Sequence, residues 1–309
     1  MEHFSYPKIS DNFQEVASRF QWTASEKIHG ANTVIGTDGR TVRIGKRKQW
    51  LEETEPFFGW QILRSFLEQS ALSIFSSLKD AEILYLYGEI FGGEYPHPDV
   101  QNIPSITAVQ TGIWYSPDIR FALFDLLKVK NGKKIFLSFT EMEKLASEAG
   151  MLTVPKIASG SLNELQSLPV RYISKMPSIL GLPAIQNNYA EGFVLKPDAE
   201  LNVSERPILK VKIPEFQENR FDESTAFNKD AMPSLNELIH FIKLMINPAR
   251  LASAKSKVGE NPSAVIEETV LDVMIDLEKV FPLRMQSVNS EEEIKLKDAI
   301  IKFIDGITQ

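Results

Sequence analysis

The spacing of apolar residues changes once along this chain, and that change limits what the chain can fold into. Up to about residue 215, short apolar stretches alternate with polar residues or are broken by turn residues, which is typical of strands. Residues 214–233 are polar and interrupted by prolines, and beyond them apolar residues recur only at helical spacing. With 309 residues, the chain can form two cores. We therefore predict an α+β domain at residues 1–228 and a small all-helical domain at residues 229–309.

Local signals predict the turns and the helix starts. The segments Thr37-Asp38-Gly39-Arg40 and Asn131-Gly132 each lie between short apolar stretches, which predicts two β-hairpins. Residues 58–78 have helical spacing and are expected to cover one face of a sheet. The pair Asn261-Pro262 begins a predicted helix that Pro282 ends. Capping-box patterns precede three other predicted helices: Thr140 with Glu143, Ser234 with Glu237, and Ser290 with Glu293.

The composition excludes several classes of protein. Cysteine is absent, which excludes disulfides, thiol nucleophiles and cysteine-ligated metals. The start of the chain has no apolar signal-peptide core, and no apolar run approaches the ~18–20 residues that cross a membrane. We expect a soluble protein in the cytoplasm or another reducing compartment, with no membrane partner. The formal net charge of −7 argues against a protein that coats nucleic acid indiscriminately, so a nucleic-acid function must depend on local charge.

A lysine close to a glycine at the end of a predicted strand is the first candidate for chemistry. In the segment Glu26-Lys27-Ile28-His29-Gly30-Ala31-Asn32, the lysine follows residues that alternate between apolar and polar. A lysine is a nucleophile only when its amine is neutral, which burial or neighbouring cations can achieve. Taken alone, such a segment is more often an ordinary strand end than an active site.

Two lysines on one face of a predicted strand are the second candidate. In Leu209-Lys210-Val211-Lys212, the side chains of Lys210 and Lys212 point the same way because a strand has a period of two. Two ammonium groups held on one face repel each other. The arrangement therefore indicates an anion between them, and phosphate is the obvious candidate.

Three further segments allow both a structural and a functional interpretation. Lys46-Arg47-Lys48 follows a predicted strand with two arginines, and it is either a solvated basic edge or a clamp for phosphate or ribose. Glu89 lies among apolar residues and glycines, and it belongs either to a capped turn or to a ligand pocket. The aromatic residues of Arg120–Asp125 belong to the core by default, although one of them could stack on a purine base.

Taken in order, these segments and Glu191-Gly192-Phe193-Val194-Leu195-Lys196 resemble the signature of the covalent nucleotidyltransferase superfamily, which contains ligases and mRNA-capping enzymes. The resemblance is strongest to the RNA ligase 2 family, which includes a bacteriophage double-strand RNA ligase and the kinetoplastid RNA-editing ligases. The form E-K-I-H-G-x-N is more specific than the K-x-D-G of DNA ligases and capping enzymes. The similarity covers most of residues 20–215 and extends into the helical tail, where those other enzymes generally have a β-barrel.

The resemblance implies a nucleotidyltransferase domain of antiparallel sheets flanked by helices, and an ATP-dependent RNA ligase that acts in RNA repair. Lys27 would attack the α-phosphate of ATP to form lysyl-AMP, and AMP would then pass to an RNA 5′-phosphate before an RNA 3′-hydroxyl displaces it. The implied cofactors are ATP and Mg²⁺, with Mn²⁺ as an alternative ion. The implied partner is RNA with 3′-hydroxyl and 5′-phosphate ends, in duplex or nicked form, and the protein is expected to be a monomer.

The resemblance also assigns roles to single residues. Lys210 and Lys212 would neutralise the α-phosphate and the departing pyrophosphate, and Glu191 would position the metal ion. Glu89 would hold the ribose hydroxyls. Phe124 would stack on adenine, with Phe121 as the alternative. Other residues of the same motifs complete the implied nucleotide site: Glu26, Ile28, Asn32, Lys46, Arg47 and Lys196.

Alternatives remain open from the sequence. A DNA ligase or a capping guanylyltransferase would use the same chemistry on another substrate. A non-catalytic RNA-binding relative would keep the fold but would not need Lys27 or the lysine pair. In the helical domain, Arg250, Lys255 and Lys257 form either a solvated face or an RNA contact.

Overall fold

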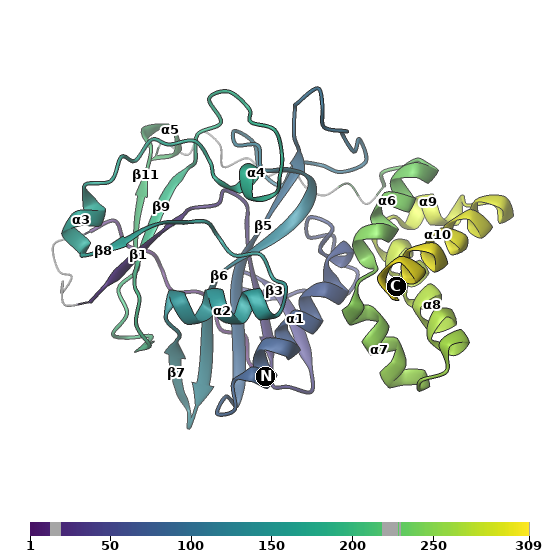
Figure 1. Ribbon diagram of the computed structural model, residues 1–309, viewed down its shortest axis with the longest axis horizontal. Coiled ribbons are helices and arrows are strands. Elements are labelled where there is room, and N and C mark those ends of the chain that lie inside the picture. Colours follow the sequence, from purple (N-terminus) through teal and green to yellow (C-terminus); the bar gives the residue numbers. More distant parts are fainter. Residues whose placement is uncertain (13–19, 218–227, 229, 309) are drawn as a thin grey trace. The chain divides into compact units, whose positions relative to one another are not determined.

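The computed structural model describes residues 1–12, 20–217, 228 and 230–308, and these residues form two compact units (Figure 1). The first unit consists of residues 1–51, 71–102 and 108–225, and the second of residues 52–70, 103–107 and 226–309. Two stretches from the first half of the sequence therefore pack with the C-terminal helices. The expected boundary at residues 228 and 229 remains a prediction, because residue 229 lies outside the described residues.

Antiparallel sheets form the core of the first unit, as the α+β prediction requires (Figure 1). The four-stranded sheet has the order β11 (Leu209–Lys212), β9 (Gly192–Pro197), β1 (Trp22–Glu26) and β8 (Lys156–Gly160). The seven-stranded sheet has the order β10 (Leu201–Asn202), β7 (Lys133–Phe136), β6 (Ser116–Lys130), β5 (Ile83–Glu94), β2 (Ala31–Thr37), β3 (Val42–Lys46) and β4 (Gln49–Trp50).

Both predicted hairpins are present. β2 and β3 are joined by a turn in which Gly39 has φ 82°, while the carboxylate of Asp38 accepts hydrogen bonds from the backbone of Arg40 and Thr41. β6 and β7 are joined by Asn131 and Gly132, with φ angles of 51° and 72°. Positive φ at both positions is what a two-residue type I′ turn requires, and Asn-Gly is its preferred sequence.

Short helices complete the first unit, and one predicted helix start was wrong. The cap of α2 lies two residues before the predicted Thr140, because the hydroxyl of Ser138 accepts the hydrogen bond from the backbone N–H of Glu141. An unpredicted capping box joins Ser161 and Glu164 at the start of α3. The helical segments from residue 60 to residue 217 are η1 (Trp60–Ile62), α1 (Arg64–Ser77), α2 (Phe139–Glu148), α3 (Leu162–Gln166), α4 (Met176–Ile179) and α5 (Pro214–Gln217). Of these, η1 and the part of α1 up to Ser70 belong to the second unit.

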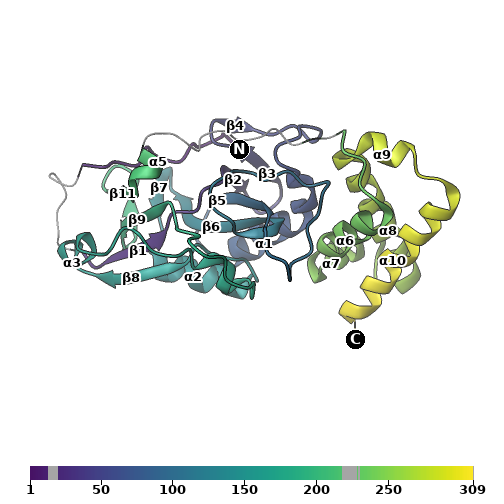
Figure 2. The ribbon, with the colours of Figure 1, turned by 90° about the horizontal axis from the view of Figure 1, so that it is seen from above.

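The N-terminal segment lies across one face of the seven-stranded sheet. Tyr85 and Tyr87 project from the same face of β5, and their hydroxyls donate to the backbone carbonyls of Glu2 and Phe4 at 2.7 and 2.9 Å. Figure 2 shows the N-terminus beside β4, where the ring of His3 packs edge-on against Trp50 at 4.8 Å. This part of the chain was not predicted to be structural, yet it closes that face of the sheet.

A buried carboxylate connects the two sheets. Asp125 of β6 is 2% exposed and accepts hydrogen bonds from Tyr6 at 2.6 Å and from Arg206 at 2.7 and 2.9 Å. The ammonium of Lys196, on β9 of the other sheet, lies 3.3 Å from the same carboxylate. Burial alone would raise the pKa of Asp125, but Arg206 and Lys196 hold it below its ordinary value. Burial also lowers the pKa of Lys196 to about 8, against the opposing effect of Asp125.

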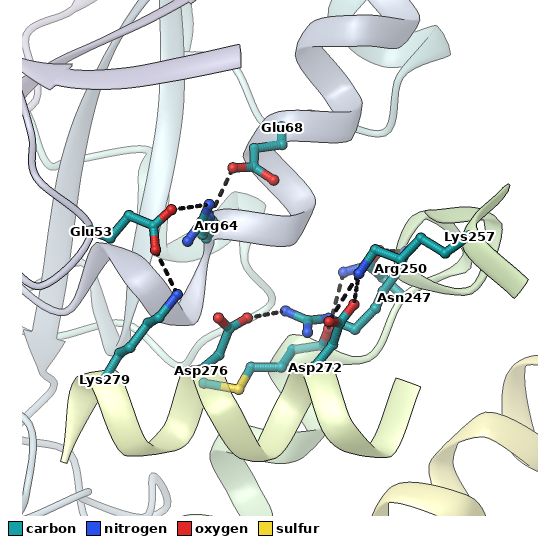
Figure 3. Close-up of polar contacts among 10 residues, drawn as sticks. Glu53, Arg64, Glu68, Asn247, Arg250, Lys257, Asp272, Asp276 and Lys279 are labelled. Carbon is teal, nitrogen blue, oxygen red and sulfur yellow. Dashed lines mark hydrogen bonds and ion pairs between the residues drawn. The ribbon is translucent and has the colours of Figure 1, made fainter. Parts of the chain in front are cut away.

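The second unit is helical, as predicted, and ion pairs connect its helices to the inserted residues 52–70. The carboxylate of Glu53 forms ion pairs with Lys279 at 2.8 Å and with Arg64 at 3.3 Å (Figure 3). Arg250 is buried and donates a hydrogen bond to Asp276 at 2.6 Å. No helix among the described residues is both long enough and apolar enough to cross a membrane. The C-terminal helices are α6 (Leu235–Met245), α7 (Pro248–Val258), α8 (Pro262–Val280), α9 (Pro282–Gln286) and α10 (Ser290–Thr308).

The caps of these helices follow the sequence closely. Ser234 and Glu237 form the predicted capping box of α6, and the carboxylate of Glu237 also accepts from the backbone of Ser105 at 2.9 Å. Asn261 caps α8 as predicted, and the helix ends before Pro282. For α10, Asn289 rather than Ser290 accepts the first-turn hydrogen bond from Glu292, so the cap lies one residue earlier than predicted.

We predict that Asp125→Asn destabilises the protein by about 3–5 kcal/mol, because it leaves the buried cations Arg206 and Lys196 without a counter-charge. Urea unfolding monitored by circular dichroism measures the loss. Tyr6→Phe removes one hydrogen bond to the same carboxylate and should lose less, about 1–2 kcal/mol. Asp80→Asn breaks an exposed ion pair with Lys130 and should have little effect. An Asp125→Asn protein as stable as the Asp80→Asn protein would contradict the linking role of Asp125.

Candidate active site

Both sheets and the N-terminal segment line a cavity of about 300 Å³ in the first unit. Most residues that the sequence assigned to a nucleotide site border it: Glu26, Lys27, Ile28, Asn32, Arg47, Glu89, Phe124, Lys196, Lys210 and Lys212. Lys46 and Glu191 are not part of the lining. The segments that looked isolated in the sequence are thus brought together around one space.

Close backbone contacts explain the glycines of two motifs. The N–H of Lys27 donates to the carbonyl of Gly192 at 2.9 Å, which fixes the end of β1 against the start of β9. Gly192 has φ 146°, and a Cβ there would lie 1.9 Å from the carbonyl oxygen of Val211. A Cβ on Gly30 would lie 2.2 Å from the carbonyl oxygen of Ile90. Side chains at either glycine would push the strands that carry the site apart.

The carboxylate of Glu191 lies between two ammonium groups. Its Oε2 is 2.7 Å from Lys27 Nζ, and its Oε1 is 2.7 Å from Lys212 Nζ. The ring nitrogen Nδ1 of His29 is 3.6 Å from the same Oε2. Glu191 is 1% exposed, and burial alone would raise its pKa. The opposing effects of Lys27, His29 and Lys212 are larger, so the pKa lies well below its ordinary value and the carboxylate is charged.

The sequence indicated an anion near the lysine pair. In the structure, the carboxylate of Glu191 is the anion that pairs with Lys212. Lys210 also lines the cavity, and its backbone N–H donates to the carbonyl of Ser10 at 2.9 Å. Neither Lys210 nor Arg47 forms an ion pair with the described residues. Both side chains therefore bring uncompensated positive charge to the cavity.

Glu89 and Asn32 are cross-strand neighbours on β5 and β2. Burial raises the pKa of Glu89 to about 8, and the charge of Glu191 adds to this, while Lys27 and Arg47 oppose it. The side-chain oxygen Oδ1 of Asn32 is buried and has no hydrogen-bond partner among the described residues. A buried polar atom without a partner is unfavourable, so the Asn32 side chain is prepared to bind a ligand.

The structure distinguishes between the two phenylalanines of the fourth motif. Phe124 borders the cavity, whereas the ring of Phe121 covers Gly88, where a Cβ would lie 2.1 Å from the ring. Phe124 is therefore available for stacking and Phe121 is not. Lys196 borders the cavity, but its ammonium donates to the carbonyl of Phe124 and forms an ion pair with Asp125. Its charge is therefore compensated within the protein.

Glu26 borders the cavity, but the groups that bind its carboxylate lie outside the cavity lining. Its carboxylate is 1% exposed and accepts hydrogen bonds from the hydroxyl of Ser174 at 2.6 Å and the backbone N–H of Lys175 at 2.8 Å. Burial raises the pKa of Glu26 to about 7, although both hydrogen bonds oppose the shift. The segment around residues 172–175 therefore positions the residue that precedes Lys27.

Seven residues of the cavity wall were not assigned to the site by the sequence analysis: Tyr6, Pro7, Lys8, Ile9, Ser25, Val154 and Val194. The first four lie far from every motif in the sequence, and no local pattern connects them to a site. The backbone of Ser10 bridges to Leu209 of β11, which carries this segment to the lysine pair. Only the tertiary fold shows this contribution.

The three basic residues of the helical domain are not equivalent. Arg250 is buried, and its guanidinium binds Asp276 and the carbonyl of Met245, which leaves it unavailable to RNA. Lys257 is held by Glu268 and Asp272, each at 2.8 Å, and Lys255 pairs with Glu260 at 3.3 Å. Contact of the two lysines with RNA remains a prediction.

Comparisons with known proteins agree on one family. The RNA ligase family model matches residues 20–212. RNA-editing ligase 2, mitochondrial, of Trypanosoma brucei brucei is 28% identical over 295 residues, which cover 78% of this chain and 71% of that protein. RNA-editing ligase 1, mitochondrial, of the same organism is 24% identical over 323 residues, which cover 84% of this chain and 68% of that protein.

Two solved structures are also similar to this chain, with lower sequence identity than the RNA-editing ligases. A mutant of Naegleria gruberi RNA ligase with ATP and Mn has a TM-score of 0.44 and 18% identity, covering 65% of this chain and 51% of that one. An archaeal ATP-dependent RNA ligase has a TM-score of 0.42 and 15% identity, covering 97% of this chain and 63% of that one. The chain spans about half of the first of these solved chains and less than two thirds of the second.

We predict that the stability of the protein relative to a Glu26→Gln variant falls as the pH rises from 5 to 8. The pKa of Glu26 is about 7 in the folded protein against an ordinary 4.5, so its stabilising effect is complete below pH 4.5 and is lost through pH 7. The maximum change in the difference between the two unfolding free energies is about 3 kcal/mol. Urea unfolding at several pH values measures it.

Glu164→Gln is the control for this experiment. Hydrogen bonds from Ser161 lower the pKa of Glu164 from 4.5, so its effect appears only in acid and with the opposite sign. A Glu26→Gln profile parallel to the wild-type profile between pH 5 and pH 8 would contradict the protonation of Glu26.

Proposed function

The chain belongs to the RNA ligase family, and on that premise we propose that it is an ATP-dependent RNA ligase that joins an RNA 3′-hydroxyl to a 5′-phosphate through lysyl-AMP on Lys27. The observation that carries the proposal is the composition of the cavity. A lysine nucleophile, uncompensated cations, a carboxylate and an aromatic ring border one space of about 300 Å³. Each is a group that a nucleoside triphosphate needs for binding or reaction.

The cavity fits ATP in its chemical character. Phe124 provides a ring for stacking on adenine, and Val154 and Val194 add aliphatic side chains to the same cavity wall. Arg47 and Lys210 provide positive charge for the phosphates without competing ion pairs. Glu89, whose raised pKa of about 8 favours the protonated carboxyl near neutral pH, and the unsatisfied oxygen of Asn32 are suited to ribose hydroxyls, which both donate and accept.

The ion pair between Lys27 and Glu191 must break before reaction. An ammonium has no free electron pair, so Lys27 must lose its proton to attack the α-phosphorus. The bond between Nζ and phosphorus then forms while the bond from the α-phosphorus to the bridging oxygen breaks, and pyrophosphate leaves with the electron pair. Lys210 and Lys212 are placed to offset the charge of the leaving group.

The later steps use the same lysine as a leaving group. The 5′-phosphate of RNA attacks the AMP phosphorus, and the bond to Lys27 Nζ breaks. The 3′-hydroxyl of the second RNA end then attacks the activated 5′-phosphate, and AMP leaves. We propose duplex or nicked RNA as the substrate, a monomeric enzyme, and a reducing compartment, for which a chain without cysteine is suited.

A divalent cation would offset the negative charge that develops on the phosphates. The described residues contain no group of three or more histidine, cysteine, aspartate or glutamate side chains that could hold a metal by themselves. This fits Mg²⁺, which usually keeps several waters and takes one or two carboxylates plus substrate phosphates. Glu191 is the carboxylate available, because its Oε2 loses its cationic partner once Lys27 carries AMP.

We predict that Lys27→Ala abolishes transfer of label from α-labelled ATP to the protein, because no other residue replaces the nucleophile. The readout is a denaturing gel of protein incubated with Mg²⁺ and labelled ATP or GTP, after pyrophosphate treatment to remove bound AMP. Lys156→Ala is the control, because it removes a lysine of the neighbouring strand β8 that does not border the cavity.

Label on the Lys27→Ala protein would assign the nucleophile elsewhere. Label from GTP alone would indicate a guanylyltransferase. If neither nucleotide labelled the folded wild-type protein, a non-catalytic RNA-binding protein would be the better conclusion. Joining of nicked RNA but not nicked DNA by the labelled enzyme would separate an RNA ligase from a DNA ligase.

A further inference from the structure

A strip of exposed cations follows one edge of the seven-stranded sheet away from the cavity. β3 pairs with β2 on one side and with the two-residue strand β4 on the other. Arg40 precedes β3, Arg43 lies within it, and Arg47 and Lys48 form the turn to β4. Because Arg47 also borders the cavity, this basic strip (Arg40, Arg43, Arg47 and Lys48) is continuous with the proposed active site.

The basic strip has no counter-charge of its own. All its side chains are exposed, and none forms an ion pair with the described residues. Some exposed cations elsewhere in the first unit are paired, for example Lys130 with Asp80 at 2.7 Å and Lys156 with Glu143 at 3.9 Å. With a net charge of −7, the chain has carboxylates in excess, yet none of those described forms an ion pair with this strip, which favours an anionic partner.

One cation of the strip is held in place. The guanidinium of Arg43 lies over the ring of Trp50 at 5.0 Å, and His3 packs on the edge of the same ring. Burial lowers the pKa of His3, and the charge of Arg43 adds to this, while a hydrogen bond to the carbonyl of Lys46 opposes it. Stacking restricts the rotamers of Arg43, so it loses less entropy when it binds a phosphate.

The length of the strip suits a nucleic-acid strand. A strand rises ~3.3 Å per residue, which separates Arg43 from Arg47 by roughly 13 Å along the edge. A stacked nucleic-acid strand carries one phosphate per ~3.4 Å of its axis, so this separation spans about four nucleotides. None of the exposed large apolar side chains of the described residues lies between residues 38 and 50, whereas a protein interface would need an apolar centre.

We propose that the basic strip binds the sugar–phosphate backbone of the RNA strand whose 5′-phosphate enters the cavity. The proposal rests on the proposed function, and it names the surface that holds the substrate beyond the reacting phosphate. Arg47, at the border of the cavity, makes the first contact. Lys48, Arg43 and Arg40 bind successive phosphates toward the β2–β3 hairpin.

The test compares Arg43→Ala/Lys48→Ala with wild type in two assays. The first measures the affinity for a fluorescent nicked RNA duplex over a series of salt concentrations, and the second measures labelling by ATP. We expect the variant to bind RNA at least about tenfold more weakly than wild type at low salt. The slope of log affinity against log salt concentration should be shallower by roughly 0.7–0.9 per lost phosphate contact. Labelling by ATP should be unchanged, because neither residue borders the cavity.

Two further variants keep the comparison decisive. Arg40→Ala/Lys48→Ala leaves Arg43 stacked on Trp50, so it tests the strip even if loss of that stacking impairs folding. Lys133→Ala/Lys144→Ala removes the same charge from β7 and α2, and β7 lies four strands from β3 in the sheet. The strip variants should lose RNA affinity, and the β7–α2 variant should not.

Unchanged affinity and slope in both strip variants, or an equal loss in the β7–α2 variant, would overturn the proposal. A parallel assay measures binding of the same variants to polyglutamate, a model of an acidic protein. Strip variants that lost affinity for polyglutamate but kept their RNA affinity would also overturn the proposal, and would assign the strip to an acidic protein. Failure of wild type to take label from ATP would overturn the proposed function separately, because the RNA affinities are measured without ATP.

Discussion

The carboxylate of Asp125 joins parts of the chain that are far apart in the sequence. It lies on β6 of the seven-stranded sheet and binds Lys196 from the four-stranded sheet, Arg206 from the segment before β11, and Tyr6 from the N-terminal segment. Phe124, its neighbour in sequence, borders the cavity. A buried charge network thus links the two sheets beside the cavity. Such networks are poor sources of net stability but are specific in geometry.

A second shared carboxylate, Glu191, determines the electrostatics of the site. Two lysines that would repel each other, Lys27 and Lys212, are each neutralised by one of its oxygens. The third lysine, Lys210, and Arg47 have no such partner among the described residues, which suits the phosphate-binding role proposed for them. The carboxylate of Glu191 therefore holds the side chain of Lys27, the proposed nucleophile, in an ion pair. Close contacts at Gly30 and Gly192 keep these groups in register.

Much of this could be predicted because the relevant signals are local or periodic. Alternation in β11 places Lys210 and Lys212 on one face, and the turn residues Asn131 and Gly132 determine their hairpin by their φ angles alone. Caps were predicted to within one or two residues because neighbouring serines, threonines and asparagines compete for the same role. The burial of Arg250 could not be predicted, since its partner Asp276 lies on another helix. The packing of residues 52–70 with the C-terminal helices likewise depends on tertiary contacts.

The cavity wall formed by Tyr6, Pro7, Lys8 and Ile9 lies outside the part of the chain that the family model matches, which begins at residue 20. The catalytic motifs and this wall are therefore separate in the sequence, although they face the same space. Substitutions in the wall can alter the shape and charge presented to a nucleotide while every motif stays intact. The wall of the proposed nucleotide site can therefore change independently of its motifs.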